Sequence, residues 1–209
     1  MTSFAELADL GVATLHEAMG KHGLVDVPLS QVVPGSRVAG PARTARCGPG
    51  DNLMVHAAVA HARPGDVLVL TMDEPAPVAL VGDLLVTQAL SQGVAALLVD
   101  GAVRDLEDLQ RLGLPVWARF VRARGATKDH VGELDVPVVV GGAEIRSGDV
   151  VVLDADGAVV IAAERIDEVL ASARERAARE EELRAKYQSG TLSYDLYGLR
   201  SVVEDTTAT

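Results

Sequence analysis

Two aspartates and one arginine have the spacing with the clearest chemical meaning in this sequence. Asp83 lies twenty-one positions before Arg104, and Arg104 is followed at once by Asp105, which gives the pattern D-x20-R-D. A carboxylate on a loop can hold Mg²⁺ or Mn²⁺ with water completing the coordination shell. A guanidinium binds a carboxylate through a two-pronged hydrogen bond and can stabilise an enolate oxygen. The three side chains therefore predict a site for a small anionic substrate beside a divalent metal.

The elements expected around these residues would bring them together. The run Gly82-Asp83-Leu84-Leu85 opens an apolar helical stretch, and residues 95–99 form a short aliphatic strand between Gly93 and Gly101. Arg104-Asp105 then falls on the loop after this strand. A helix start offers free N–H groups and a positive dipole end, which bind a carboxylate without a basic side chain. Gly82 would allow the backbone to come close to a ligand.

Each of these residues also has an ordinary structural explanation. Aspartate is a leading helix-capping residue, so Asp83 and Asp105 can each simply cap the helix that follows. Arg104 can be a surface arginine on a loop. Asp100 is a weaker metal candidate, because capping of the Gly101 turn explains it equally well. The chemical interpretation rests on the joint spacing and not on any single residue.

Composition limits the class of protein. The 209 residues are 48% hydrophobic but only 3% aromatic, so we expect one domain, residues 1–209, with an aliphatic core. The net charge of -11 argues against a nucleic-acid partner and against an anionic membrane surface. The single cysteine, Cys47, excludes an intrachain disulfide and a cysteine-based zinc site within one chain. Without a basic leader or a long apolar run, a soluble cytoplasmic protein is expected.

Helices and strands alternate in the first part of the chain. Helices are expected from Thr2 or Ser3 to about Met19, from Asp51 or Asn52 to His61, from Asp83 onward, and from about Asp105 to Leu112. Strands are expected at 37–46 with a break at Gly40-Pro41, at 67–71, at 95–99 and at 116–120, while residues 21–35 read as loop.

The second part of the chain is β-rich and then helical. Short strands are expected at 136–140, 150–153 and 158–161, followed by a long polar helix over about 164–188 and a frayed tail from Glu204 to Thr209. Acids and arginines alternate along the polar helix, which is typical of a solvated or subunit-bridging face. The order of elements predicts a single mixed α/β layered domain.

Most of the chain resembles one known family. The segments that carry the resemblance are GDNLMVHAA at 50–58, RPGDVLV at 63–69, GDLL at 82–85, GVAALLVDGAVRD at 93–105, LPVWAR at 114–119, VPVVVGG at 136–142 and SGDVVVLDADGAVVI at 147–161. They are similar to the class II 4-hydroxy-4-methyl-2-oxoglutarate/4-carboxy-4-hydroxy-2-oxoadipate aldolases, which are related to the regulator of ribonuclease E activity. D-x20-R-D is the aldolase signature of that family, and its regulator branch typically lacks the aspartate pair.

The resemblance implies a role for each residue of the motif. Arg104 would bind the pyruvate unit and stabilise its enolate, and Asp105 would hold the metal, directly or through water. Asp83 would orient a water that acts as the base. The backbone amides of Leu84 and Leu85 would hold the pyruvyl carboxylate.

The resemblance also implies an assembly. It implies a swivelling phosphohistidine-type β/β/α fold and a ring-shaped homotrimer or a hexamer of stacked rings, with active sites between subunits. An acidic residue from the neighbour's C-terminal helix would reach the water shell of the metal. Glu180, Glu181 and Glu182 are the candidates, and Glu181 is favoured.

The expected activity is a lyase reaction. A Mg²⁺- or Mn²⁺-dependent enzyme would cleave 4-hydroxy-4-methyl-2-oxoglutarate or 4-carboxy-4-hydroxy-2-oxoadipate and release pyruvate, because a metal chelated by the 2-oxo acid provides the electron sink that a retro-aldol step needs. Decarboxylation of oxaloacetate passes through the same enolate, so it is an expected side activity. The physiological substrate and pathway stay open.

Other functions fit the sequence less well. A Schiff-base aldolase needs a buried lysine, and the chain has only Lys21, Lys128 and Lys186, on polar or loop segments. A non-enzymatic, regulator-like interaction protein is permitted by the resemblance but disfavoured by the intact motif. No G-x-G-x-x-G segment supports a methyltransferase.

The residues that select the group at C4 cannot be identified from spacing. Arg122, Arg124, His56 and Asn52 are all candidates, and no pattern separates them. His56 and His61 lie five apart on an expected helix and are interpreted as surface or packing residues.

Overall fold

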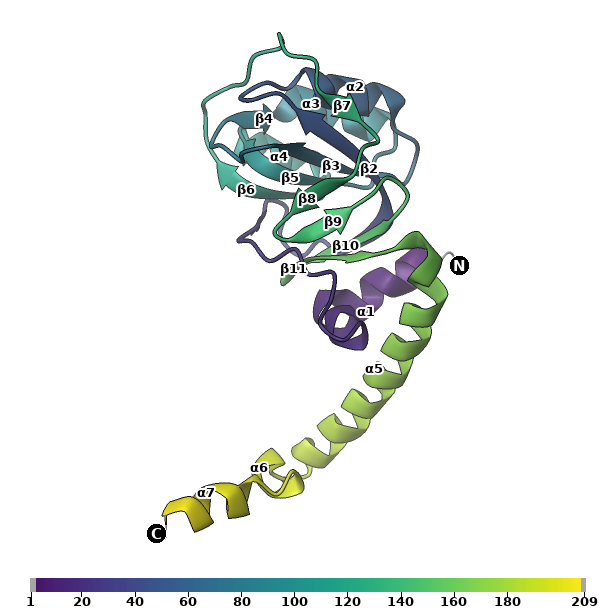
Figure 1. Ribbon diagram of the computed structural model, residues 1–209, viewed down its shortest axis with the longest axis vertical. Coiled ribbons are helices and arrows are strands. Elements are labelled where there is room, and N and C mark those ends of the chain that lie inside the picture. Colours follow the sequence, from purple (N-terminus) through teal and green to yellow (C-terminus); the bar gives the residue numbers. More distant parts are fainter. Residues whose placement is uncertain (1–2, 208–209) are drawn as a thin grey trace.

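The computed structural model describes residues 3–207, with the side chains of residues 4–204. Capping of the first helix by Thr2 or by the side chain of Ser3 therefore lies outside the described residues, as do the last two residues of the expected frayed tail. The chain forms a mixed α/β domain from which one long helix projects (Figure 1).

A nine-stranded mixed sheet forms the centre of the domain. Its order is β1-β6-β5-β3-β2-β10-β11, with β4 paired to β5 and β7 paired to β2. The strands are β1 Ser30–Gln31, β2 Val38–Cys47, β3 Val67–Met72, β4 Ala79–Val81, β5 Ala96–Val103, β6 Val116–Val121, β7 Glu133–Leu134, β10 Val150–Asp154 and β11 Gly157–Ile161. Strands β8 Val138–Val140 and β9 Ala143–Ile145 form a separate two-stranded sheet. Strands β3 and β5 are buried throughout, as parallel strands covered on both faces usually are.

Helices lie along the whole chain, and some of them cover the sheet. They are α1 Ser3–Ala18, α2 Leu53–His61, α3 Asp83–Ser91, α4 Leu106–Leu112, the short 3₁₀ helix η1 Ala163–Arg165, α5 Ile166–Gln188, α6 Ser193–Leu196 and α7 Leu199–Thr207. Helices α2, α3 and α4 pack on one face of the parallel strands, and the β8-β9 layer packs on the other (Figure 1). Helix α1 and the first turns of α5 cover β10 and β11. This layering agrees with the expected β/β/α arrangement.

The expected break at Gly40-Pro41 is wrong, because strand β2 runs unbroken through both residues. It changes partner there instead. Residues 38–41 pair antiparallel with β10, and residues 42–47 pair parallel with β3. A Cβ at Gly40 would lie only 2.5 Å from the carbonyl oxygen of Gly65, so a side chain does not fit there. The glycine and proline mark a change of neighbour and not the end of the strand.

The expected turn at Gly101 is also wrong. Strand β5 continues through Asp100 and Gly101 to Val103, so Arg104 follows it directly. Asp100 does not cap a turn, since its buried carboxylate is paired with Arg119 at 2.5 Å. A Cβ at Gly101 would lie 3.1 to 3.2 Å from the side chains of Leu80 and Met72. The glycine therefore allows close packing inside a strand.

Several short elements were not expected. Strand β1 lies in the segment expected to be loop, and β4, β7 and β9 are additional pairings. Helices α6 and α7 follow the long helix, and α7 extends to Thr207, so the expectation of a frayed tail from Glu204 is wrong for residues 204–207. The four strands are two or three residues long, and pairing with neighbouring strands rather than local sequence pattern stabilises strands of that size.

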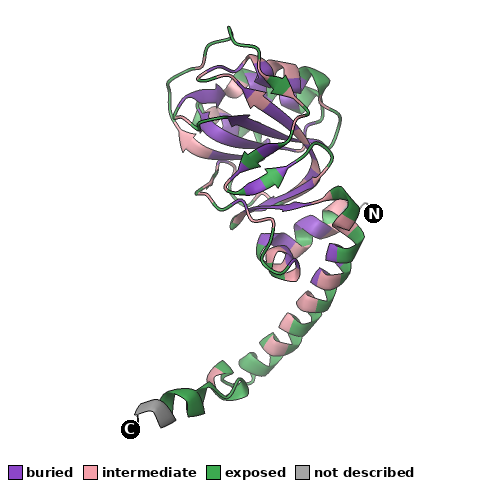
Figure 2. Ribbon diagram, in the orientation of Figure 1, coloured by how far each residue is buried: buried purple, intermediate pink, exposed green. Residues whose placement is uncertain are grey.

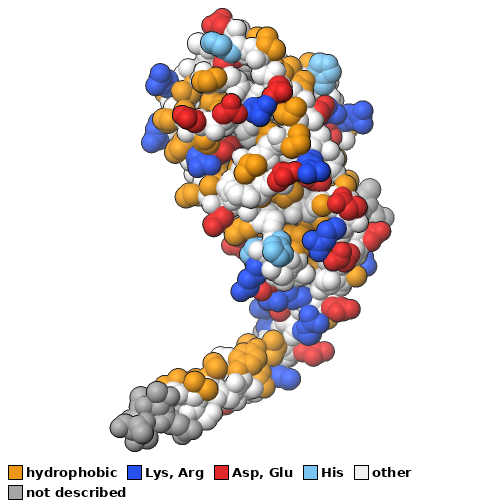
Figure 3. Space-filling model, viewed as in Figure 1, with side chains coloured by type: hydrophobic (Ala, Val, Ile, Leu, Met, Phe, Trp, Pro, Cys, Tyr) orange, Lys and Arg blue, Asp and Glu red, His pale blue; other side chains and the backbone are white. Residues whose placement is uncertain are grey.

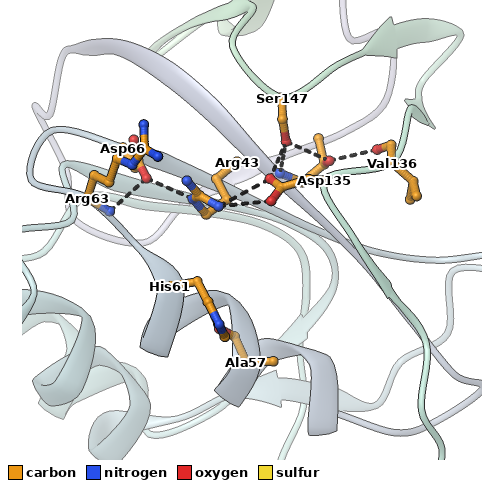
Figure 4. Close-up of polar contacts among 9 residues, drawn as sticks. Arg43, Ala57, His61, Arg63, Asp66, Asp135, Val136 and Ser147 are labelled. Atoms are coloured by element: carbon orange, nitrogen blue, oxygen red, sulfur yellow. Dashed lines mark hydrogen bonds and ion pairs between the residues drawn. The ribbon is translucent and has the colours of Figure 1, made fainter.

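An ion-pair network joins the sheet to the β-rich part of the chain, away from the D-x20-R-D residues (Figure 4). Arg43 of β2 donates from Nε to Asp66 at 3.0 Å and from Nη1 to Asp135 at 3.0 Å. Asp135 also accepts a hydrogen bond from the hydroxyl of Ser147 at 2.7 Å. The guanidinium is largely buried between the two carboxylates, so this network has a structural role.

The distal part of α5, with α6 and α7, projects away from the domain as an arm, residues 177–207 (Figures 1 and 2). Only Val169, Leu170 and Ala173 of α5 are buried, and all three lie in its first turns. Among the described residues, none of the helices has the combination of length and apolar character that crossing a membrane requires.

Candidate active site

The three motif residues meet at one edge of the sheet. Strand β4 pairs parallel with β5, with Val81 beside Val103, so both strands end at this edge. Gly82 follows β4 and leads into α3, while Arg104 and Asp105 follow β5 and lead into α4. The backbone N–H of Arg104 donates to the carbonyl of Val81 at 3.0 Å and fixes the two strand ends together. The spacing of the motif therefore corresponds to one helix and one strand.

Asp105 has a backbone conformation that asparagine, aspartate and glycine adopt most readily. Its φ of 59° and ψ of 44° lie in the left-handed region, which costs energy for a non-glycine residue and is enriched at functional sites. Its side chain makes no capping hydrogen bond to α4. Instead Oδ2 accepts from the backbone N–H of Asp83 at 3.3 Å and lies 3.4 Å from Nε of Arg104. Helix capping therefore does not explain Asp105.

Gly82 is required by the close approach of two side chains. A Cβ at this position would lie 2.6 Å from Oδ2 of Asp105 and 3.0 Å from Nε of Arg104. Its backbone is extended, with φ of -136° and ψ of -174°, so any residue could adopt that conformation. The absence of the side chain, and not conformational freedom, is what the site uses.

The start of α3 offers backbone N–H donors next to Arg104 and Asp105. Gly82 is the N-cap residue, and Asp83 is the first residue of the helix, so the alternative explanation of Asp83 as the capping residue is wrong. The first helical hydrogen bond runs from the N–H of Val86 to the carbonyl of Gly82 at 3.1 Å. The N–H groups of Leu84 and Leu85 precede it and have no acceptor within the helix.

A pocket of about 160 Å³ opens beside these groups. It is lined by Asn52, His56, Ala79, Leu80, Gly82, Asp83, Leu84, Leu85, Arg104, Ala126 and Lys128. Leu85 is buried, whereas the side chain of Leu84 is 72% exposed at its edge. The pocket is smaller than the usual pockets for drug-sized ligands, so a small metabolite fits it better.

Helix α2 and its N-cap residue contribute two polar side chains that the sequence pattern does not separate from the other candidates for substrate selection. Asn52 and His56 both line the pocket, and the side-chain atoms Oδ1 of Asn52 and Nε2 of His56 are buried without a hydrogen-bond partner among the described residues. Burial of the ring, together with the nearby Lys128 ammonium, lowers the pKa of His56 below its ordinary value. The interpretation of His56 as a surface or packing residue is therefore incomplete. His61, in contrast, is exposed, and its Nδ1 donates to the Ala57 carbonyl on its own helix (Figure 4).

Lys128 is the pocket residue that sequence reasoning assigned to no function. It lies on the loop after β6, residues 122–130, and is exposed at the edge of the pocket. A Schiff-base lysine is normally desolvated, so this exposure disfavours that mechanism. Arg122 and Arg124, which were candidates for selecting substrate, do not line the pocket. No local pattern could have identified Lys128, although Asn52 and His56 have the i, i+4 spacing of one helix face.

Asp51 holds the loop that carries Lys128. Its fully buried carboxylate accepts hydrogen bonds from the hydroxyl of Thr127 at 2.7 Å and from the N–H groups of Asp129 at 2.6 Å, His130 at 3.2 Å and Leu53 at 2.8 Å. Burial alone would raise the pKa of Asp51, but the hydrogen bonds to its charged form prevail and keep that pKa well below its usual range.

Within one chain, Glu181 is not brought together with Asp83, Arg104 and Asp105. It lies on the distal half of α5, in the arm, with its side chain 76% exposed and paired to Arg184 at 3.2 Å (Figure 1). Within the part of the chain that the structure describes, no three histidine, cysteine, aspartate or glutamate side chains come close enough to form a complete protein-only metal site. The donor set of Asp105 with Asp83 nearby still suits Mg²⁺, which commonly takes one or two carboxylates and keeps several waters.

Several known proteins are similar to this chain in sequence or structure. A protein of Halalkalibacterium halodurans with the name "Putative 4-hydroxy-4-methyl-2-oxoglutarate aldolase" is 38% identical over 145 residues, which cover 69% of each chain. Streptomyces coelicolor RraAS2, described as an unusual member of the RNase ES inhibitor RraA family, has a TM-score of 0.77 and 32% identity, with 86% of this chain and 95% of that chain covered.

A second solved structure extends the comparison. RraA from Thermus thermophilis, described as an RNA-processing inhibitor, has a TM-score of 0.64 and 28% identity, with 71% of this chain and 90% of that chain covered. The sequence model of the RraA-like family, described as Aldolase/RraA, matches residues 7–160, which is most of the folded domain. The chain belongs to the RraA-like family.

Proposed function

We propose that this protein is a divalent-metal-dependent aldolase that cleaves a 4-hydroxy-2-oxo acid and releases pyruvate. One observation supports this most directly: Arg104 and the start of α3, with its free N–H groups, line one small pocket. The carboxylate of Asp105 lies next to them, because it accepts from the N–H of Asp83 and lies 3.4 Å from Nε of Arg104. Substrates of this class include 4-hydroxy-4-methyl-2-oxoglutarate and 4-carboxy-4-hydroxy-2-oxoadipate. The name of the Halalkalibacterium halodurans relative supports the first of them.

The pyruvyl end of the substrate would bind at the motif. Its carboxylate fits the N–H groups of Leu84 and Leu85, where the helix dipole favours negative charge. Arg104 would donate to the 2-oxo oxygen and stabilise the negative charge that develops there. Lys128, at the edge of the same pocket, supplies a second positive charge for the further carboxylate that these substrates carry.

Asp105 is the residue best suited to hold the metal. Its carboxylate is partly exposed and is positioned by the N–H of Asp83. A bound Mg²⁺ or Mn²⁺ would polarise the 2-oxo group and share the charge of the enolate. A glutamate of the neighbouring subunit's C-terminal helix, with Glu181 as the favoured candidate, would complete the water shell.

The bond changes follow from this placement. Asp83 would orient a water that takes the proton of the 4-hydroxyl group, and the C3–C4 bond then breaks. Its electron pair passes toward the 2-oxo group and gives the enolate of pyruvate, while C4 becomes the carbonyl carbon of the second product. Protonation of the enolate at C3 yields pyruvate. Oxaloacetate would lose CO₂ through the same enolate, so decarboxylation is the proposed side activity.

The test is pyruvate release in an assay coupled to lactate dehydrogenase. Purified protein would be given 4-hydroxy-4-methyl-2-oxoglutarate and, separately, oxaloacetate, with Mg²⁺ and with EDTA. Metal-dependent release from the hydroxy acid supports the proposal. Release from oxaloacetate alone would retain the enolate site but assign a different substrate, and absence of release from both contradicts the proposal.

A regulator-like function is the second candidate, because two structural relatives are described as inhibitors of RNA processing or of RNase ES. The net charge of -11 disfavours direct contact with RNA. Inhibition of a ribonuclease by a protein that releases no pyruvate would favour this candidate.

A further inference from the structure

Asn52, which lines the pocket, has a side-chain oxygen, Oδ1, that needs a hydrogen-bond donor. Its side chain is 7% exposed, and Nδ2 donates to the carbonyl of Leu80 at 2.9 Å. This hydrogen bond determines which end of the amide faces which way, so Oδ1 is the end without a partner among the described residues. A buried acceptor left unpaired costs about 1–3 kcal/mol, so the pocket favours a ligand that supplies a donor there.

His56 lies in the first turn of α2, four residues after Asn52, and its side chain can supply a hydrogen-bond donor. Its backbone N–H donates to the carbonyl of Asn52 at 3.4 Å, and the two side chains are four residues apart, a spacing that makes them neighbours on a helix surface. Nε2 of His56 is also buried without a partner among the described residues. A neutral imidazole can donate at this nitrogen, and the burial of the ring beside Lys128 favours the neutral form.

We propose that Asn52 and His56 together recognise a hydroxyl group of the substrate, and that this group is the 4-hydroxyl of the 4-hydroxy-2-oxo acid. The inference rests on the proposed function and specifies which substrates the pocket accepts. In the bound substrate this hydroxyl can donate its single hydrogen to Oδ1 of Asn52 and accept from Nε2 of His56. For cleavage the hydroxyl turns this hydrogen to the water that Asp83 orients, while His56 continues to donate to its oxygen. A carboxylate only accepts, so Oδ1 would repel it and leave one of the two buried atoms unpaired.

The two residues would then distinguish the aldol substrate from oxaloacetate. Oxaloacetate and pyruvate in their keto forms carry no hydroxyl group, so neither needs this pair. Arg104, Asp105 and the start of α3 act on the part of the molecule that all three compounds share. Loss of the pair should therefore affect cleavage of the hydroxy acid selectively.

The experiment compares two reactions of one enzyme. We expect His56→Leu to lower kcat/KM for 4-hydroxy-4-methyl-2-oxoglutarate about tenfold, the effect of losing one neutral hydrogen bond that persists in the transition state. Asn52→Ala should raise KM for the same substrate about tenfold, because its hydrogen bond is made in the bound substrate. The kcat/KM for oxaloacetate and the inhibition constant of pyruvate should stay within about twofold of wild type. His56→Gln, which retains a donor, should recover part of the loss.

His61→Leu is the matched control. It lies on the same helix, is exposed, and hydrogen-bonds only to the Ala57 carbonyl of that helix among the contacts that the structure describes. This variant should leave both reactions unchanged. If Asn52→Ala does not fold because the contact with Leu80 is lost, His56→Leu carries the test alone.

Three outcomes would overturn the inference. Equal loss of both reactions with weaker Mg²⁺ binding would assign the two side chains to the water shell of the metal. Unchanged cleavage of the hydroxy acid in both variants would remove them from recognition. A wild-type protein without activity on either compound would refute the proposed function itself, and the inference with it, a result distinct from the other two.

Discussion

Arg104 is the residue whose chemistry is hardest to replace. Its Nε lies 3.4 Å from Asp105, so the guanidinium can face the metal ligand and still offer its terminal nitrogens to a ligand in the pocket. A lysine carries the same charge but concentrates it at one point on a flexible chain. The geometry of the group, and not its charge alone, is what the site would use.

Arg104→Lys should therefore lower kcat/KM at least a hundredfold with both the hydroxy acid and oxaloacetate, the usual cost of removing a preorganised donor to an oxyanion. Steady-state kinetics of pyruvate release would measure this. Arg122→Lys is the matched control, because Arg122 is exposed and donates to the neighbouring Val121 carbonyl outside the pocket. Activity near that of wild type in Arg104→Lys would remove the guanidinium from catalysis.

Asp51 is a second residue whose protonation can be tested, through stability. The pKa of Asp51 is depressed in the folded protein because four donors stabilise its charged form. A group with a depressed folded pKa stabilises the fold above its unfolded pKa, about 3.9, and this contribution is lost as the pH falls toward the folded value.

Asp51→Asn should accordingly lower the free energy of unfolding by roughly 2–4 kcal/mol at pH 7. The difference from wild type should shrink below about pH 4, where the aspartate begins to lose its advantage. Urea unfolding at several pH values would measure both. A difference that stays constant from pH 7 to pH 3 would contradict the assignment of the effect to the charged carboxylate.

At the level of elements, the loop of residues 122–130 determines one wall of the site. The N–H of Ala79 donates to the carbonyl of Arg124 at 2.7 Å, and the N–H of Asn52 donates to the carbonyl of Thr127 at 2.9 Å. The loop is thereby fixed to β4 and to the start of α2. A Cβ at Gly125 would lie 2.8 Å from Nη1 of Arg104, so this glycine leaves room for the guanidinium.

Gly125→Ala should separate activity from stability. The contact involves the far end of a flexible side chain, and φ at Gly125 is not in the left-handed region, so the melting temperature should change by less than about 2 °C. Displacement of Arg104 should still lower kcat/KM about tenfold or more. Gln88→Ala, at an exposed position of α3, is the control. A large loss of stability in Gly125→Ala, or full activity, would contradict this account of the loop.

Sequence patterns were most informative where an element was long or chemically distinctive. The sequence predicts α1, the start of α3 and the long α5, and the motif spacing predicts that Asp83, Arg104 and Asp105 lie together. It does not predict the kink that interrupts α1 at Gly11, where φ is 80°. The short β4 was missed, although it is what joins Gly82 to the end of β5. Gly101 was interpreted as a turn, because the packing against Met72 and Leu80 that requires a glycine is not visible in a sequence.

The pocket wall formed by α2 and Lys128 had no comparable signal. Asn52 and His56 could be placed on one helix face, but which face lines the pocket depends on the pairing of Leu80 and on the path of the loop after β6. Such relations between distant segments are set by tertiary packing and not by local pattern.

At the level of the whole molecule, the arm is the feature that one chain does not explain. Its exposed apolar side chains are Tyr187, Leu192, Leu196, Tyr197, Leu199, Val202 and Val203. Figure 3 shows hydrophobic side chains gathered on the visible face of the arm. Contiguous apolar surface of this kind usually marks a protein interface. Contact of the arm with another subunit of a homotrimer or hexamer would bury these side chains and bring an acidic residue of α5 to a neighbour's pocket.

The proposal that the site is shared between subunits predicts complementation. Asp105→Ala and Glu181→Gln should each lose most metal-dependent activity as pure proteins. When the two are co-expressed and form mixed oligomers, some sites combine Asp105 of a Glu181→Gln subunit with Glu181 of an Asp105→Ala subunit, so part of the wild-type activity should return. Glu180→Gln and Glu182→Gln, each paired with Asp105→Ala in the same way, identify which glutamate acts. Because a glutamate acting within its own chain leaves every site of the mixture defective, mixed oligomers without recovered activity would refute a site shared through Glu181.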